Sequence, residues 1–114
     1  MSLDRFVYWR EQPPTQRAIG MLLRDYMGGA GKVRWSAGTG RYFIDLPGHC
    51  SSPTWRVGHV GRSFEPGMKR WIEVCLCENW ADVITREGDD FTNGIAERLA
   101  NVLMRAFNGK ADPS

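Results

Sequence analysis

Arginine stands beside a tryptophan or a tyrosine at five places in this sequence, and this repetition is its most informative chemical feature. The pairs are Trp9-Arg10, Arg34-Trp35, Arg41-Tyr42, Trp55-Arg56 and Arg70-Trp71. A guanidinium group can stack on a ring and still donate a fork of hydrogen bonds to a carboxylate or a phosphate. Such pairs are therefore typical of a surface that binds an acidic or flat partner. Neighbouring residues of a strand point to opposite faces, however, so each pair is also explained by one core ring and one solvated charge.

Thiol and imidazole groups offer two further kinds of chemistry. The candidate groups are His49, Cys50, His59, Cys75 and Cys77. They are ligand types that suit zinc, but structural zinc sites usually separate paired ligands by two to four residues, and these groups do not follow that spacing. Cys50 with His49 or His59 as a base is the candidate nucleophile, and the nearby Arg41 and Arg56 would favour its thiolate. The surrounding glycines and serines, however, give no sign of an ordered oxyanion site. We therefore predict no metal, no cofactor and no catalytic residue, and keep a Cys50-dependent enzyme or redox protein as an alternative.

The composition is that of one globular domain. The chain has 114 residues, of which 42% are hydrophobic and 25% are charged, and this length suffices for a core without metal or disulfides. No apolar run approaches the ~20 residues of a membrane helix, and the first residues lack the apolar core of a secretion signal. The three cysteines are an odd number and suggest reduced thiols. We expect one domain over 1–114, located in the cytoplasm.

The charge is small in total but unevenly divided. The net charge is +2, with a balance of +6 over residues 1–72 and −4 over residues 73–114. Such a difference suits a basic face for an anionic partner, or an attraction between the two halves of one fold. With so small a total and only three lysines, the composition does not demand strong binding to nucleic acid.

Alternation and residue type predict a series of strands. The predicted strands cover 4–10, 32–37, 41–46, 69–77 and 80–86, with a shorter one at 55–60. Gly38-Thr39-Gly40 suits the turn of a hairpin between the second and third of these strands. Loops or turns are expected at 47–53 and 65–67, which are rich in glycine, proline and small polar residues.

Two segments show the periodicity of amphipathic helices. The first runs from Thr15, a suitable N-cap, to Met27, and Gly28 ends it. The second runs over 91–108, with Asp90 as a cap and Gly109 as its stop, and the tail at 110–114 is expected to fray.

These elements predict an α+β fold, with a single antiparallel sheet of about five to six strands and two helices packed on one face. Ile72 and Val74 occupy one side of the strand at 69–77, so Trp71 must point to the opposite side. A tryptophan on an uncovered sheet face is costly in water. We expect that face to be covered by a loop, a second copy of the chain or a partner.

The first hypothesis for function is a non-catalytic binding or self-associating domain that engages a protein partner or forms a homodimer. Its binding residues are predicted to be Arg34, Arg41, Arg56, Arg70 and Trp71. The alternative is single-stranded nucleic-acid binding on the same face, where bases stack on rings and arginines neutralise phosphates. No membrane partner is expected.

Overall fold

The computed structural model describes residues 2–29, 31–46, 70–86 and 90–113. In these ranges the strands are β1 (Ser2–Trp9), β2 (Lys32–Ser36), β3 (Arg41–Leu46), β4 (Arg70–Leu76), β5 (Trp80–Arg86) and β6 (Gly109–Lys110). The helices are α1 (Gln16–Met27) and α3 (Asp90–Ala106). The loops and the short strand predicted at 47–53, 55–60 and 65–67 lie outside the described residues.

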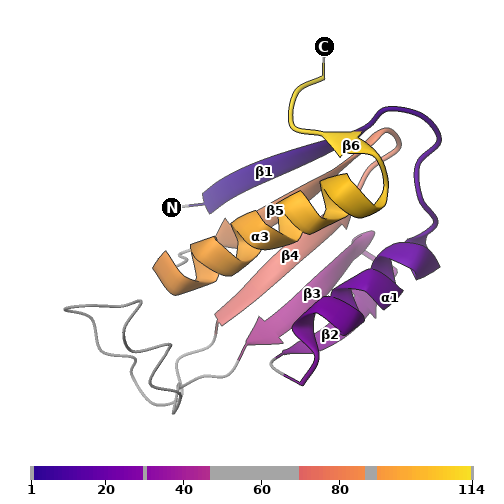
Figure 1. Ribbon diagram of the computed structural model, residues 1–114. Helices are drawn as coiled ribbons and strands as arrows, with labels where there is room; N and C mark the ends of the chain where they lie inside the picture. The colour runs from indigo at the N-terminus through magenta and orange to yellow at the C-terminus, as the bar shows by residue number, and fades with distance from the viewer. Residues whose placement is uncertain (1, 30, 47–69, 87–89, 114) are drawn as a thin grey trace.

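The strands form one six-stranded antiparallel sheet in the order β2-β3-β4-β5-β1-β6 (Figure 1). The hairpins β2–β3 and β4–β5 pair strands that are neighbours in the sequence. In contrast, β1, at the start of the chain, pairs with β5, which lies more than 70 residues later. This pairing places β4 in the middle of the five long strands.

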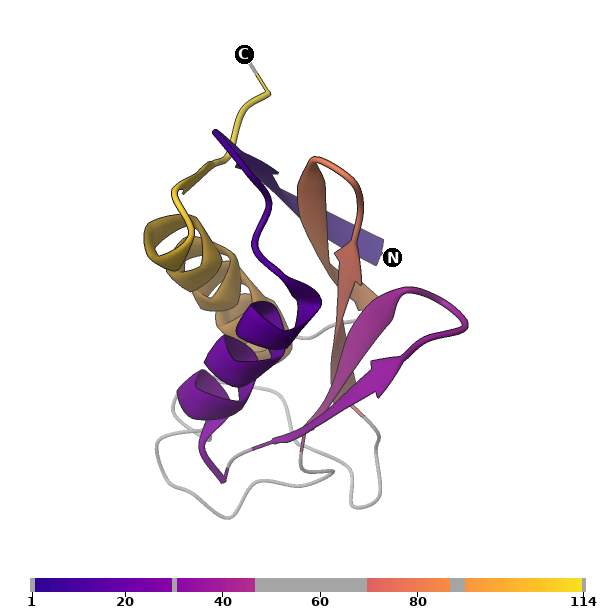
Figure 2. The same cartoon turned by 90° about the vertical axis from the view of Figure 1, so that its right-hand side faces the viewer.

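Both helices lie on the same side of the sheet, as Figure 2 shows. The long helix α3 packs on β1, β5 and β4, and α1 packs beside it over β2. The predicted α+β architecture is thereby confirmed. Neither helix of the described ranges is long and apolar enough to cross a membrane.

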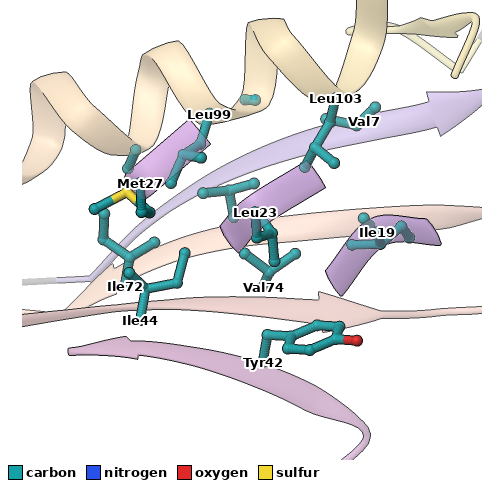
Figure 3. Packing of buried hydrophobic residues seen from close by; sticks show 14 of the residues in the cluster. Val7, Ile19, Leu23, Met27, Tyr42, Ile44, Ile72, Val74, Leu99 and Leu103 are labelled. Carbon is teal, nitrogen blue, oxygen red and sulfur yellow. The ribbon is translucent and has the colours of Figure 1, made fainter. Parts of the chain in front are cut away.

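The core fills the space between the helices and the sheet (Figure 3). The helices contribute one apolar stripe each, and the strands contribute every second residue, as the periods of 3.6 and 2 require. The largest fully buried side chains include Ile19, Leu23, Tyr42, Ile44, Ile72, Leu99 and Leu103. Burial of this layer is the dominant favourable term for the fold.

The ends of α1 follow the predicted signals. The side-chain hydroxyl of Thr15 accepts a hydrogen bond from the Ala18 amide at 3.1 Å, which satisfies one of the free amides of the first turn. Gly28 takes a positive φ of 56° and donates its amide to the Arg24 carbonyl at 2.9 Å. A left-handed residue at this point lets the chain leave the helix toward β2.

The C-terminal segment corrects the prediction of a helix to 108 and a frayed tail. The helix α3 starts at Asp90, which lies in the first turn, and ends at Ala106. Asn108 takes the positive φ of 54°, because the short polar side chain of asparagine tolerates the left-handed region. Gly109–Lys110 then pairs with Tyr8 and Trp9 as β6.

Candidate functional site

The open face is the side of the sheet that points away from α1 and α3, and no described element covers it (Figure 2). It is formed by alternate residues of five strands, whose neighbours Ile44, Ile72 and Val83 are buried under the helices. Its residues are Lys32, Arg34 and Ser36 of β2, Arg41, Phe43 and Asp45 of β3, Trp71, Glu73 and Cys75 of β4, Trp80, Asp82, Ile84 and Arg86 of β5, and Asp4, Phe6 and Tyr8 of β1.

The antiparallel register aligns these side chains in rows across the sheet. The middle row contains, in strand order, Arg34, Phe43, Glu73, Ile84 and Asp4. The row beside it contains Ser36, Arg41, Cys75, Asp82 and Phe6. Side chains that are adjacent within a row are about 5 Å apart at Cβ, so their charges interact directly.

Glu73 lies at the centre of the open face, although its residue is only 4% exposed. Its carboxylate accepts hydrogen bonds from Arg41 at 2.6 Å, from Arg86 at 2.5 Å and from the Trp71 indole at 3.0 Å. Burial raises the pKa of a carboxyl, but the bonds from Arg86, Trp71 and Arg41 outweigh burial and hold the pKa of Glu73 below its ordinary value. Glu73 therefore anchors one tryptophan and two arginines from three strands.

Arg34 is engaged within the chain at the β2 edge. Its Nε donates to Asp45 Oδ2 at 2.7 Å, and its guanidinium carbon lies 5.0 Å from the centre of the Phe43 ring. The two charged side chains are 53% and 42% exposed. An ion pair so exposed contributes little to stability, because solvent screens the two charges.

Two carboxyl groups meet at the opposite side of the face. Burial, followed by a hydrogen bond and repulsion from Asp4, raises the pKa of Asp82 to about 7. Its Oδ1 is buried and has no hydrogen-bond donor among the described residues, which also favours the neutral acid. The Asp4 and Asp82 pair thus places acidic groups on β1 and β5, away from Lys32 and Arg34 on β2.

Three aromatic rings form a continuous cluster on β1 and β5. The ring centroids of Phe6 and Tyr8 are 6.0 Å apart, and those of Tyr8 and Trp80 are 6.4 Å apart. Phe6 is 41% exposed and Trp80 is 37% exposed. Rings that remain in water in this way are typical of the central contacts of a binding surface.

The described thiols, Cys75 and Cys77, are free and half-buried. Burial, with a smaller effect of the adjacent Cys75, raises the pKa of Cys77 above its ordinary value of 9.0. A thiol with a raised pKa is protonated at neutral pH and is a poor nucleophile. Cys50, His49 and His59 lie outside the described residues.

The structure divides the predicted binding residues. Arg34, Arg41 and Trp71 lie on the open face. Arg70 is 7% exposed and lies two residues before Ile72, so both side chains point to the same side of β4. The alternation that places Trp71 on the open face therefore places Arg70 on the side that the helices cover. Arg56 lies outside the described residues.

Several residues of the open face were not among the predicted binding residues. Glu73, Asp82 and Arg86 organise its charges, and Phe6, Tyr8 and Trp80 supply its exposed rings. The sequence alone could have placed Asp82 and Arg86 on the open face, because polar and apolar residues alternate along β5. The pairing of β1 with β5, which joins the three rings, had no local signal.

Within the described ranges, no group of three or more His, Cys, Asp or Glu residues is arranged to hold a metal ion. Comparisons with protein-family models, with characterised proteins and with solved structures found no significant match to the chain. The functional argument therefore depends on the geometry of the open face.

We expect Asp82→Asn to remove a pH dependence of stability. The folded pKa of about 7 exceeds the ordinary value of 3.8, so folding favours the protonated acid. This contribution is complete below about pH 4, declines as pH rises and is absent above about pH 8. Its size is on the order of 1–2 kcal/mol, well below what the full shift implies, because solvent screens a partly exposed carboxyl.

Urea denaturation at pH 5 and pH 8 measures this effect. The difference in unfolding free energy between the wild type and Asp82→Asn should favour the wild type more at pH 5 than at pH 8. Asp25→Asn, at an exposed position of α1, is the control and should track the wild type. An equal difference at both pH values contradicts the assignment of a raised pKa.

Proposed function

We propose that this chain is a non-catalytic binding domain that docks a protein surface against its open face. The observation that carries the proposal is the cluster of Phe6, Tyr8 and Trp80, two of whose rings are more than one-third exposed. Buried aromatic anchors with a polar surround dominate the energy of protein interfaces. Trp71 and Phe43 continue this apolar surface toward the middle of the sheet.

The charges of the open face also favour a protein over a polyanion. Arg34 is paired with Asp45, and Arg41 and Arg86 are paired with Glu73. Phosphates of a nucleic acid would have to displace these carboxylates and leave them unpaired, whereas a protein surface that carries both signs of charge pairs with the guanidinium groups and the carboxylates alike. Binding that depends on counterion release requires several cations that are free to neutralise phosphates.

The free thiols of Cys75 and Cys77 support action in a reducing compartment such as the cytoplasm. The raised pKa of Cys77 supports a structural role for this thiol rather than a reactive one.

Site-specific photo-cross-linking tests the proposal. A photoreactive phenylalanine analogue replaces Tyr8 on the open face in one variant, and Met21 in the other. Met21 is a matched control because it is 57% exposed and lies on α1, on the other side of the sheet. Both variants are irradiated in a lysate of the source cells and as purified protein.

We expect protein adducts at position 8 that survive nuclease treatment and are several-fold more abundant than adducts at position 21. Equal labelling of the two positions contradicts a docking role for the open face. Adducts at position 8 that disappear with nuclease support the nucleic-acid alternative and overturn the protein partner.

A further inference from the structure

We infer that the partner on the open face is a second copy of this chain, docked face to face about a two-fold axis parallel to β4. The inference rests on the proposed function and adds to it the identity and the orientation of the partner. Three features of the open face carry it: the position of β4, the placement of opposite charges, and the area available.

The strand order gives the open face a natural centre. In the order β2-β3-β4-β5-β1, two long strands lie on each side of β4. Rotation by a half turn about an axis along β4 places β2 over β1 of the second copy and β3 over its β5, and each row faces the same row. Such an interface is isologous, because each copy contributes the same surface.

This rotation brings opposite charges together in each row. In the middle row Arg34 faces the partner's Asp4. Phe43 lies over the partner's Ile84, whose side chain is already largely buried by its own neighbours. In the next row Arg41 faces the partner's Asp82, and the approach of this cation favours the ionised form of that carboxyl. On the other side of the middle row, Asp45 faces the partner's Arg86 when the β4–β5 register is continued by two residues from the pair of Glu73 and Ile84.

The other face-to-face arrangement does not show this complementarity. In this arrangement the two-fold axis also lies between the two sheets but runs perpendicular to the strands. Each strand then lies over the same strand of the partner. Arg34 then faces the partner's Arg34, and Asp4 faces the partner's Asp4. Like charges brought together at an interface cost several kcal/mol, so the charge pattern selects the axis parallel to β4.

The central residue is compatible with the axis. Glu73 of one copy faces the partner's Glu73, but each carboxylate already accepts bonds from Arg41 and Arg86 of its own chain. The negative charge is therefore compensated before the two sheets meet. Cys75, one row away, lies beside the axis on the same strand.

The area of the open face also favours an axis through its centre. Five strands at a spacing of about 4.8 Å, with an average length of about 23 Å, give a flat area on the order of 500 Å². A stable interface buries about 800 Å² of accessible surface on each partner. Since side chains increase the accessible area above the flat value, the dimer reaches this size only by covering nearly the whole face.

Charge reversal provides the first test. At ~100 µM, light scattering of the full chain should give twice its mass of 12.9 kDa. Analytical ultracentrifugation measures the Kd of the dimer. Asp4→Arg and Arg34→Glu should each weaken the dimer about thirtyfold, because each change introduces two like-charge contacts. The double variant should return to within about threefold of the wild type.

This rescue is specific for contact between chains. Four strand spacings, about 19 Å, separate Arg34 from Asp4 within one chain, so the two side chains cannot meet there. Asp4→Arg also relieves the repulsion at Asp82. Arg34→Glu removes an exposed ion pair and the contact with the Phe43 ring, and places a carboxylate near Asp45 at the exposed β2 edge. Both single variants should therefore remain folded, which circular dichroism checks.

Cross-linking through Cys75 tests the axis. In a Cys50→Ser, Cys77→Ser background, a bismaleimide with a spacer of about 10 Å matches the separation of packed sheets and should join two copies. The matched variant with a single cysteine in place of Met21 should not be joined.

A 12.9 kDa mass at every concentration overturns the dimer. The proposed function still stands if position 8 forms protein adducts in the lysate but not in the purified protein. If position 8 forms no protein adducts in either sample, the proposed function is overturned as well. A dimer that the double variant does not restore, or that Cys75 does not cross-link, overturns the axis along β4.

Discussion

Glu73→Ala should lower the free energy of unfolding by about 3 kcal/mol, one of the two largest effects that we expect from a single substitution. The change removes the shared acceptor of three hydrogen bonds from Arg41, Arg86 and Trp71. Arg41 is the more costly donor to leave without an acceptor, since its side chain is 22% exposed whereas that of Arg86 is 45% exposed. Urea denaturation near pH 7 measures the effect.

Asp45→Ala is the matched control, because it breaks an arginine–carboxylate pair of similar length that is largely exposed. We expect a much smaller loss there, because solvent screens an exposed ion pair. The deficit of Glu73→Ala should also shrink in acid. A carboxyl whose folded pKa is lowered stabilises the fold above its ordinary value of 4.5 and loses this contribution as pH falls through the folded pKa. Equal losses for the two variants at neutral pH would refute the central role of Glu73.

Gly20→Ala should destabilise the protein by about 2–3 kcal/mol, even though alanine is the better helix former by about 1 kcal/mol. A Cβ at Gly20 would lie 2.2 Å from the Tyr42 hydroxyl and 2.8 Å from its ring carbon. Tyr42 cannot move away easily, because it is 1% exposed and its hydroxyl donates to the Gln16 carbonyl at 2.8 Å. Thermal or urea denaturation gives the difference.

Gly94 offers the control within α3. A Cβ at that position would meet nothing nearer than an Arg98 nitrogen at 3.7 Å, so Gly94→Ala should stabilise by about 0.5–1 kcal/mol. In a Tyr42→Phe background, which removes the nearest atom, Gly20→Ala should cost less than it does in the wild type. The same loss in both backgrounds would show that Tyr42 is not the obstacle.

Local pattern was sufficient to predict most of the described secondary structure. The alternation of Ile72 and Val74 with Trp71 and Glu73 has a period of two, and the apolar stripe of α1 has a period of 3.6. Either period can be recognised in the sequence when a segment is long enough to repeat it. The C-terminal strand β6 was missed because two residues cannot show a period. Its existence depends on an adjacent free edge of β1.

The amino-acid sequence by itself therefore determined the elements, the α+β class and the side to which Trp71 points. Only the tertiary structure decided which residues meet there, because strand order and register are set by packing between segments that are distant in the sequence. Arg41 reaches Glu73 across 32 residues, and Tyr8 reaches Trp80 through a strand that returns from the start of the chain. The alternation of side chains along a strand shows which face of the sheet each side chain occupies, but the pairing of distant strands determines which side chains are its neighbours.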